Sequence, residues 1–465
     1  MRTRISPIVG LFLLFFPLWT SAQNLVQVIQ DEMEFEHIPS VSACIVKDGE
    51  IVWMQSFGFA DVQNNVAATP QTPYLLASVS KTFTATALMQ AVEEGLIDLE
   101  ADVNTYLPFS LRNPDYLNIP ITVKQLMTHT SSIQDNWAVM EDYYTYGADP
   151  ILSLSAVMNM YFDPLGADFS SDNFLGGAPG TVYEYTNMGN ALLGYLVERV
   201  TNEPFETYCD AHIFERLCME NTSWKLSDFD TTILAIPYKW QGGEFVAYQH
   251  YTFADYPNGG LRASIEDLAH YLIAYQQNGI FGTDTLLSPN TVAGMLTPQV
   301  LSVDATQGLV WYLDEFYPDG SNPVSLWTHN GGESGVSTDI ILYPSHNAAI
   351  GIITNGEGDN SYMVDALLAE AETLVSTGAG NPTCSVTSID EWEDERASIQ
   401  LYPNPVRTVI FLEEVAPHTS FAIHNLQGQI VSLGKVETNQ IEVEFLPTGM
   451  YIFSIDGKHQ RFIKQ

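Results

Sequence analysis

Basic residues are scarce in this sequence. Its 465 residues include 17 Lys and Arg against 56 Asp and Glu, which gives a formal net charge of −39 at pH 7. A protein that binds nucleic acid neutralises phosphates with clustered Lys and Arg, so this shortage argues against a nucleic-acid partner. It equally disfavours strong attraction to an anionic membrane surface. The hydrophobic share of 46% and the charged share of 16% are typical of a folded globular chain, and the length predicts two or three domains.

Long apolar runs are missing after the N-terminus, where no stretch reaches the ~18 residues that indicate a membrane-spanning helix. The one marked run covers 5–19. It follows Met-Arg-Thr-Arg and precedes small residues that end before Gln23. A positive start, a short apolar core and small residues together indicate a secretory signal peptide over 1–22. We therefore expect an exported mature chain that begins near Gln23 and holds no transmembrane segment.

Cysteine is also rare, with four residues at Cys44, Cys209, Cys218 and Cys384. Their spacing does not match a zinc site of the Cys-x-x-Cys kind, and we expect neither a metal nor an organic cofactor. An exported chain can form disulfides, and four cysteines allow three pairings. Cys209 and Cys218 are closest in sequence and are the first candidates for a bridge. Cys44 lies in an apolar run, which is typical of a free buried thiol.

Strand patterns open and close the larger part of the chain, with helix patterns between them. An Asp-Gly turn separates two alternating runs at the start, which predicts a hairpin. Apolar residues recur at helical spacing in several later segments. The predicted strands are 41–46, 51–57, 340–343 and 348–354, and the predicted helices are 78–95, 187–200, 264–277 and 362–375. This order predicts one mixed α/β domain of the α+β class over 23–376.

The composition changes after this domain. Residues 377–397 contain Gly, Thr and a group of acids around Trp392, which is typical of an exposed linker. From 398 to 465 short strand patterns alternate with turn signals. We predict a small all-β module there, of the β-sandwich type.

Several catalytic motifs are absent. The sequence has no His-Glu-x-x-His zinc helix, no Gly-x-x-x-x-Gly-Lys-Ser/Thr phosphate loop and no Gly-x-Ser-x-Gly nucleophile elbow. It does have Ser78-Val79-Ser80-Lys81 at the start of the first predicted helix. Residues three apart share a helix face, so the Lys81 amine can approach the Ser78 hydroxyl. A buried lysine that loses its proton can then make Ser78 a nucleophile.

Neither this motif nor the Tyr-x-Asn motif is specific alone. A second Ser-x-x-Lys begins at Ser432 in the predicted β module. Tyr-x-Asn occurs four times, beginning at Tyr116, Tyr185, Tyr256 and Tyr402. The motif at Tyr185 differs from the others because it follows Pro-Gly-Thr and opens a predicted helix.

Taken together and in order, several segments of the sequence resemble those of a known family. The segments "KTFTATALMQAVEEGLIDLEADVNTYLP", "ITVKQLMTHTSSI", "PGTVYEYTNMGNALLGYLVERV", "NGGLRASIEDLAHYL" and "WTHNGGESGVSTDIILYPSHNAAIGIITN" resemble the serine β-lactamase-related family. They follow the family's order over roughly residues 25–375. The resemblance implies a β-lactamase/transpeptidase-like fold, with an antiparallel sheet and a helical subdomain. The family includes class C β-lactamases, penicillin-binding carboxypeptidases, esterases and D-amino-acid peptidases.

The resemblance also implies roles for single residues. Ser78 matches the acylated nucleophile and Lys81 its activating partner. Tyr185 matches the tyrosine that moves protons to the leaving group and from the deacylating water. Asn187 matches the residue that binds substrate and helps to hold the lysine.

The third motif of the family matches His329-Asn330-Gly331, on a strand at the edge of the site. The resemblance implies that Gly332 supplies the second oxyanion N–H beside that of Ser78. Many β-lactamases have a lysine where His329 stands, and that lysine attracts the substrate carboxylate. A neutral imidazole attracts an anion less, so we expect an esterase or D-peptidase rather than a strong β-lactamase.

Other residues near these motifs have simpler interpretations. His129 is expected to pack within the structure. Arg262 either meets a substrate carboxylate at the rim of the site or, as we prefer, forms a salt bridge. Trp137, Tyr143 and Tyr144 line a pocket or fill the core, and the sequence favours neither.

The C-terminal module carries a second resemblance. "LYPNPV", "NLQGQIVSLGKV" and "LPTGMYIFSIDG" resemble the sorting domain of the type IX secretion system. This implies that the secretion machinery is a partner and that the protein is secreted or on the cell surface. A carbohydrate-binding or spacing β-sandwich is the alternative.

Together these observations predict a secreted serine hydrolase that acts through an acyl-enzyme on Ser78. The expected substrate is an ester or a small amide, including a D-amino-acid peptide. One alternative is a D-alanyl-D-alanine carboxypeptidase or β-lactamase. The other is a non-catalytic module that binds peptidoglycan or peptide.

Overall fold

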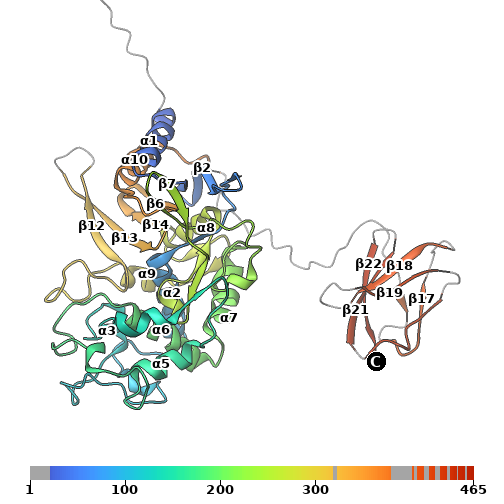
Figure 1. Cartoon of the computed structure of the whole chain (residues 1–465), viewed down its shortest axis with the longest axis horizontal. Helices are drawn as coiled ribbons and strands as arrows, with labels where there is room; N and C mark the ends of the chain where they lie inside the picture. The colour runs from blue at the N-terminus through green and yellow to red at the C-terminus, as the bar shows by residue number, and fades with distance from the viewer. Residues whose placement is uncertain are drawn as a thin grey trace, which may run out of the picture. The chain divides into compact units, whose positions relative to one another are not determined.

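The chain forms two compact units, Met1–Cys384 and Ser385–Gln465 (Figure 1). The computed structural model describes residues 21–317, 322–378, 401–402, 406–412, 418–424, 430–436, 440–447, 449–455 and 458–464. The predicted signal peptide lies almost wholly outside the described residues, and so does most of the predicted linker.

A seven-stranded antiparallel sheet organises the first unit, in the order β12-β13-β14-β15-β1-β2-β3. Its strands are β1 Ser40–Lys47, β2 Glu50–Asp61, β3 Val66–Ala67, β12 Tyr312–Phe316, β13 Val324–Glu333, β14 Val336–Tyr343 and β15 Ala348–Thr354. The early strand β1 pairs with the late strand β15, with Val41 opposite Thr354. Segments from both ends of the unit therefore meet in the middle of one sheet.

The predicted hairpin is confirmed as β1 and β2. Asp48 and Gly49 connect the two strands with φ angles of 52° and 81°. A two-residue hairpin turn of the favoured kind needs positive φ at both positions, which Asp-Gly accommodates with little strain.

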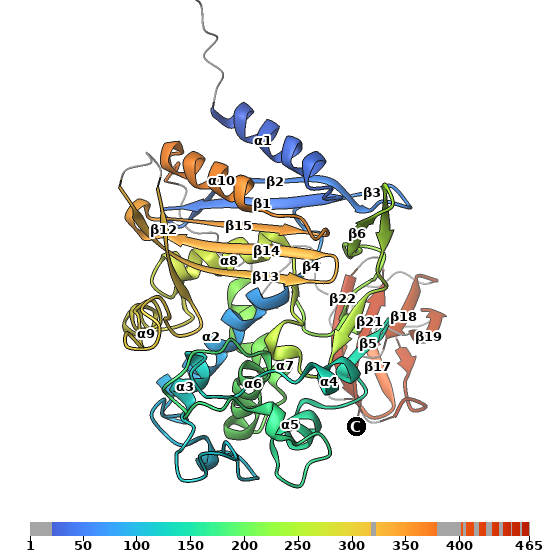
Figure 2. The ribbon, with the colours of Figure 1, turned by 60° about the vertical axis from the view of Figure 1, so that its left-hand side comes forward.

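Helices cover both faces of the sheet, as Figure 2 shows. Along β1, Val41, Ala43 and Ile45 pack toward α1 (Ser21–Phe35) and α10 (Ser361–Thr373). The alternate residues Cys44 and Val46 belong to the core that contains α8 (Ile265–Gln276). This period of two is what a strand buried on both faces requires.

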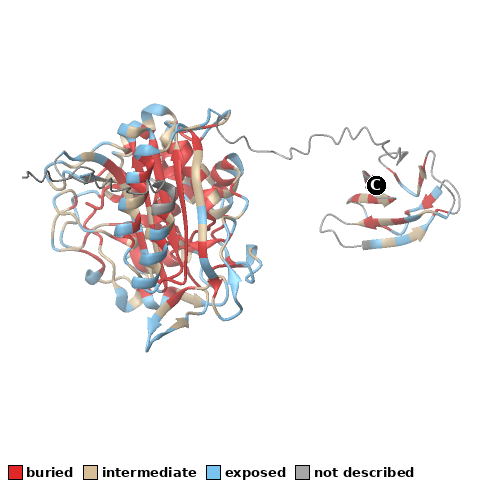
Figure 3. Ribbon diagram, turned by 90° about the horizontal axis from the view of Figure 1, so that it is seen from above, coloured by how far each residue is buried: buried red, intermediate tan, exposed pale blue. Residues whose placement is uncertain are grey.

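A helical region lies beside the sheet, and its central helix is α2 (Ser80–Glu93). Residues 80–91 are all buried, so no face of this stretch of the helix is exposed to solvent. Buried residues fill the interior of the first unit (Figure 3). The helix was expected to begin at 78, but a short 3-10 helix, Ala77–Val79, precedes it. The other helices are α3 Val123–Met127, α4 Trp137–Met140, α5 Leu154–Phe162, α6 Asn187–Thr201, α7 Phe205–Cys209 and α9 Pro289–Met295.

Four two-stranded ribbons complete the described part of this unit. They are β4 Tyr74–Leu75 with β9 Arg262–Ala263, β5 Tyr144–Tyr146 with β8 Tyr251–Phe253, β6 Tyr238–Gln241 with β7 Glu244–Ala247, and β10 Ile280–Phe281 with β11 Asp284–Thr285. The pairing of β4 with β9 positions the chain just before Ser78.

The second unit contains two antiparallel sheets, as predicted for a small β-sandwich. The strands are β16 Leu401–Tyr402, β17 Val409–Leu412, β18 Ser420–His424, β19 Ile430–Lys435, β20 Gln440–Glu442, β21 Gly449–Ile455 and β22 Lys458–Lys464. Ile410, Ile423, Phe453 and Phe462 are buried in its own core. The unit therefore has an apolar interior independent of the first.

The predicted bridge between Cys209 and Cys218 is wrong. Cys209 is a free buried thiol in α7, whereas Cys218 is disulfide-bonded. A short sequence separation does not ensure the Cβ geometry that a disulfide requires, and Cys209 is packed into the apolar core. Cys44 is free and buried, as expected. Cys384 lies outside the described residues.

Candidate active site

Ser78 lies at the turn that leads from β4 into α2. The preceding residue, Ala77, is buried and has a φ of 47°, a left-handed conformation that costs an L-residue about 1 kcal/mol or more. Leu76 is held on both sides: its N–H donates to the Leu261 carbonyl at 2.8 Å, and its carbonyl accepts from Thr338 Oγ1 at 2.8 Å. Contacts with two other segments therefore fix the backbone from which Ser78 projects.

Lys81 is fully buried one turn further along. Its Nζ donates to Ser78 Oγ at 3.1 Å, to Asn187 Oδ1 at 2.7 Å and to the Asn258 carbonyl at 2.6 Å. Burial lowers the pKa of Lys81 to about 7, although nearby carboxylates oppose the shift. The amine is thus poised to exchange a proton with Ser78 near neutral pH.

Tyr185 reaches Ser78 from the other side. Its hydroxyl donates to Ser78 Oγ at 2.8 Å. The Lys81 Nζ lies 4.9 Å from the centre of the Tyr185 ring, and burial raises the pKa of this tyrosine above its usual value. The resting phenol is therefore protonated and can donate a hydrogen bond.

His129 packs against this group, as expected. Its ring centre lies 4.7 Å from that of Tyr185, and its Nδ1 accepts from the Thr186 N–H at 3.3 Å. Burial holds the pKa of His129 well below its ordinary value, so the ring is neutral.

Asp135 anchors the Tyr-x-Asn segment and was not predicted from the sequence. Its carboxylate accepts from Thr186 Oγ1, from the backbone and side-chain nitrogens of Asn187, and from the Met188 N–H, at 2.8–3.0 Å. These donors lie at the N-terminus of α6, where a negative charge is stabilised. No sequence motif marks Asp135, because it lies about fifty residues before the segment that it holds.

The third motif lies on β13. His329 is buried, with Nδ1 2.8 Å from the Asn330 carbonyl and no partner at Nε2 among the described residues. Burial, reinforced by the charge of Lys81, lowers the pKa of His329 to about 3. The ring is neutral at any physiological pH and cannot act as a cation.

The two glycines after Asn330 face different surroundings. A Cβ on Gly331 would lie 2.5 Å from the Leu76 carbonyl oxygen and 2.9 Å from the Ser78 nitrogen. A Cβ on Gly332 would meet nothing within 4 Å. Gly331 therefore permits the close approach of β13 to the nucleophile turn, whereas Gly332 borders open space.

A cavity of about 290 Å³ opens in front of Ser78. It is lined by Ala77, Ser78, Trp137, Met140, Tyr144, Tyr185, Asn187, Phe253, Asp255, Asn258, Gly259, Gly332 and Glu333. Two of these residues, Asp255 and Glu333, are carboxylates that the sequence analysis missed. Each adjoins a motif noted in the sequence: Glu333 follows Gly332, and Asp255 precedes the Tyr-x-Asn that begins at Tyr256.

For three aromatic residues the sequence favoured neither a place in a pocket nor a place in the core. Trp137 and Tyr144 line the cavity. Tyr143 is buried elsewhere in the core and donates to Asp168 Oδ2 at 2.7 Å.

Neither interpretation of Arg262 is correct. The side chain is buried and does not line the cavity, and its Nη2 donates to the Tyr251 carbonyl at 2.5 Å. No ion pair to Arg262 is formed by the described residues. A backbone carbonyl thus takes the place of the expected carboxylate.

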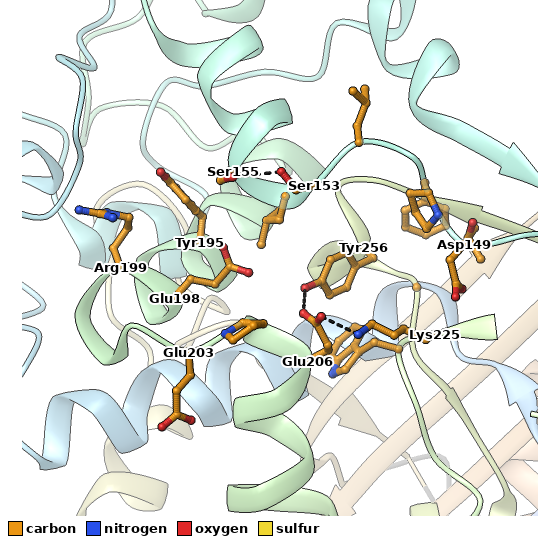
Figure 4. Close-up of a pocket in the computed structure, with 18 of the residues that line it drawn as sticks. Asp149, Ser153, Ser155, Tyr195, Glu198, Arg199, Glu203, Glu206, Lys225 and Tyr256 are labelled. Carbon is orange, nitrogen blue, oxygen red and sulfur yellow. Dashed lines mark hydrogen bonds and ion pairs between the residues drawn. The ribbon is translucent and has the colours of Figure 1, made fainter. Parts of the chain in front are cut away.

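A larger cavity of about 580 Å³ is also lined in part by the segment 253–260 (Figure 4). It contains none of the predicted catalytic residues. Three of its polar residues are paired with one another: Glu206 accepts from Tyr256 at 2.7 Å and forms an ion pair with Lys225 at 2.8 Å. We place the candidate site at the smaller cavity because catalysis requires a nucleophile beside a base, not volume.

Metal chemistry finds no support in the described residues, among which no group of three His, Cys, Asp or Glu side chains could hold an ion. In the same residues, no helix is long and apolar enough to cross a membrane.

Two family models match separate parts of this chain. The profile of a family described as beta-lactamase matches residues 25–375, and that of a secretion system C-terminal sorting domain matches 400–465. Protein flp of Staphylococcus aureus (strain MW2) is 27% identical over 359 residues, which cover 76% of this chain and 66% of flp. The chain therefore spans slightly less than two thirds of the length of this relative.

Two solved structures share the fold. An octameric penicillin-binding protein homologue from Pyrococcus abyssi has a TM-score of 0.61 and 22% identity, and the match covers 96% of both chains. EstCE1, described as a hydrolase with promiscuous acyltransferase activity, has a TM-score of 0.60 and 18% identity over 76% of this chain and 98% of its own.

Proposed function

Because the chain belongs to the beta-lactamase family, we propose that it is a serine hydrolase that acts through an acyl-enzyme on Ser78. The proposed substrate is an ester or a small amide, including a D-amino-acid peptide. The observation that carries the proposal is the hydrogen-bonded series Tyr185 OH, Ser78 Oγ and Lys81 Nζ, with distances of 2.8 and 3.1 Å.

Acylation begins when neutral Lys81 takes the Ser78 hydroxyl proton and Oγ bonds to the substrate carbonyl carbon. The carbonyl oxygen becomes an oxyanion that the N–H groups of Ser78 and Gly332 stabilise. The intermediate then releases the leaving group, which takes a proton from Tyr185. The Lys81 ammonium returns a proton to Tyr185, and the acyl group remains on Ser78.

Deacylation uses the same groups in reverse. A water in the vacated space gives its proton to the Tyr185 and Lys81 pair and attacks the acyl carbon. Ser78 Oγ leaves and recovers a proton from Lys81. The scheme needs no metal or organic cofactor.

The neutral imidazole of His329 favours an esterase or peptidase over a carboxylate-binding β-lactamase or D-alanyl-D-alanine carboxypeptidase. Covalent labelling of Ser78 by penicillin would favour that alternative. A non-catalytic peptidoglycan or peptide binder is disfavoured, because a binder needs no lysine held at hydrogen-bond distance from a serine.

The protein is secreted or on the cell surface, since its C-terminal segment is a secretion sorting domain. We propose that type IX machinery recognises this segment and that the first unit meets its small-molecule or peptide substrate outside the cell.

The test uses the full mature chain with a panel of p-nitrophenyl esters, D- and L-aminoacyl nitroanilides and a chromogenic cephalosporin. We expect Ser78→Ala to abolish turnover and the covalent acyl adduct that mass spectrometry detects. Ser432→Ala changes the other Ser-x-x-Lys and should keep wild-type activity. Equal activity of wild type and Ser78→Ala would refute the mechanism, and absence of turnover throughout would favour the binding module.

A further inference from the structure

The charge of the catalytic cavity is one-sided. Its charged lining residues are Asp255 and Glu333, and none of the lining side chains described by the structure is basic. Asp135 adds a third carboxylate close enough to influence Lys81. Burial raises the pKa of Asp255 to about 7, so this carboxyl is only partly ionised at pH 7. Acidic groups still outnumber basic ones here, so we expect a substrate anion to be repelled and a cation attracted.

Glu333 is held in place at the wall of the cavity. It follows Gly332 directly on β13, beside the proposed oxyanion donor. Its Oε2 accepts from Tyr144 OH at 2.9 Å and its Oε1 from the Ser334 N–H at 2.9 Å. Each carboxylate oxygen can accept a further bond, and no cation pairs with Glu333 among the described residues.

The surrounding side chains suit a cation. Trp137, Tyr144 and Phe253 line the same cavity, and aromatic faces attract ammonium groups. Conversely, no cationic side chain among the described lining residues would pair with a carboxylate, because His329 is neutral and Arg262 is buried elsewhere. The volume of about 290 Å³ restricts the occupant to a small group.

We propose that Glu333 makes this site selective for esters or amides that carry a cationic amine within a few bonds of the scissile carbonyl. The inference rests on the proposed hydrolase function and specifies its substrate class. Asp255 acts as a positioning residue. Its Oδ2 accepts from Asn258 Nδ2 at 2.7 Å, and the Asn258 carbonyl holds Lys81.

Matched substrates test the proposal with the full mature chain. On the acyl side, alanine p-nitroanilide of each configuration is compared with its N-acetyl derivative. On the alcohol side, acetylthiocholine is compared with its neutral isostere, 3,3-dimethylbutyl thioacetate. We expect kcat/KM to be about tenfold higher or more for the cation in at least one pair, and the preference to fall as salt is added.

Glu333→Gln should bring kcat/KM for the cationic and neutral members of each pair to a similar value, and Glu333→Asp should keep part of the preference. Glu357→Gln is the matched control. Glu357 likewise accepts from a tyrosine hydroxyl and a backbone N–H, each at 2.9 Å, but it does not line the cavity.

The outcomes separate the two proposals. Turnover that depends on Ser78 with no preference for the cation in either pair overturns the selectivity alone. A salt-independent preference, or one that persists in Glu333→Gln, also overturns it. If neither member of either pair is hydrolysed and the broader panel is also inert, the hydrolase function itself fails.

Discussion

Two cavities share the wall formed by 253–260, and they differ in how their polar groups are used. In the larger cavity, Ser153 caps helix α5 by accepting from the Ala156 N–H, and Lys225 is paired with Glu206. At the smaller cavity, Ser78 caps no helix, and Lys81 beside it forms no ion pair with any residue that the structure describes. In the larger cavity, Ser153 and Lys225 have partners that serve the structure. At the smaller one, a serine hydroxyl and a lysine amine face each other. The arrangement of reactive groups, rather than the volume of the cavity, therefore identifies the candidate catalytic site.

The two lysines give the strongest test of this comparison. Lys81→Met should lower kcat/KM by at least about 10³-fold, because no other described base touches Ser78 Oγ. Lys225→Met should leave kcat/KM near wild type. Steady-state hydrolysis of the best panel substrate measures both, and equal losses would show that the cavities are not functionally distinct.

Substitution of one tyrosine at each cavity should give a smaller difference in kcat/KM than substitution of the two lysines. Tyr185→Phe removes the hydroxyl that donates to Ser78 and should reduce kcat/KM by about 10²-fold through lost proton transfer. Tyr256→Phe removes a hydroxyl that only meets Glu206. A large kcat/KM loss in Tyr256→Phe would mean that the larger cavity contributes to the chemistry.

The pH profile should show a smaller effect of defined sign. Lys81 must be neutral to accept the proton, and burial lowers its pKa to about 7. kcat/KM should therefore rise about tenfold per pH unit below 7 and level off above it. Burial likewise raises the pKa of Glu198 in the larger cavity to about 7, yet Glu198→Gln should leave the profile in place. A profile that moves with Glu198→Gln would contradict the assignment to Lys81.

The two glycines test how tightly the smaller cavity is built. Gly331→Ala forces a methyl group against backbone atoms of Leu76 and Ser78 and should reduce the free energy of unfolding by about 2 kcal/mol. Gly332→Ala meets no atom within 4 Å and should unfold at nearly the wild-type temperature. Thermal unfolding of both variants measures the difference. Equal stability would show that β13 is not pressed against the nucleophile turn.

Local patterns predicted much of the fold. The Asp-Gly turn located the β1–β2 hairpin. The spacing from Ser78 to Lys81 predicted that the amine approaches the hydroxyl, although Ser78 lies in the 3-10 helix before α2. These predictions succeeded because their evidence lies within a few residues of the feature.

Contacts between distant segments were not predictable in this way. Asp135 joins the site only through tertiary packing, which leaves no trace in local spacing. The position of Glu333 beside Gly332 does not reveal that its side chain lines the cavity. The same limitation explains the wrong bridge of Cys209 with Cys218 and the misplaced Arg262. Sequence proximity and charge alone do not establish which groups meet.

The pairing of β1 with β15 has a consequence for the order in which activity arises. Val41 and Thr354 are opposite each other, so the sheet closes only after almost the whole first unit has been synthesised. Pairings this far apart in sequence form slowly, because a long loop must close first. The turn that carries Ser78 is held by a hydrogen bond from Thr338 to the Leu76 carbonyl, and Thr338 lies on β14, which pairs with that late strand. A nascent or truncated chain thus contains Ser78 without the neighbours that position it. We therefore expect hydrolysis only after the whole first unit has folded.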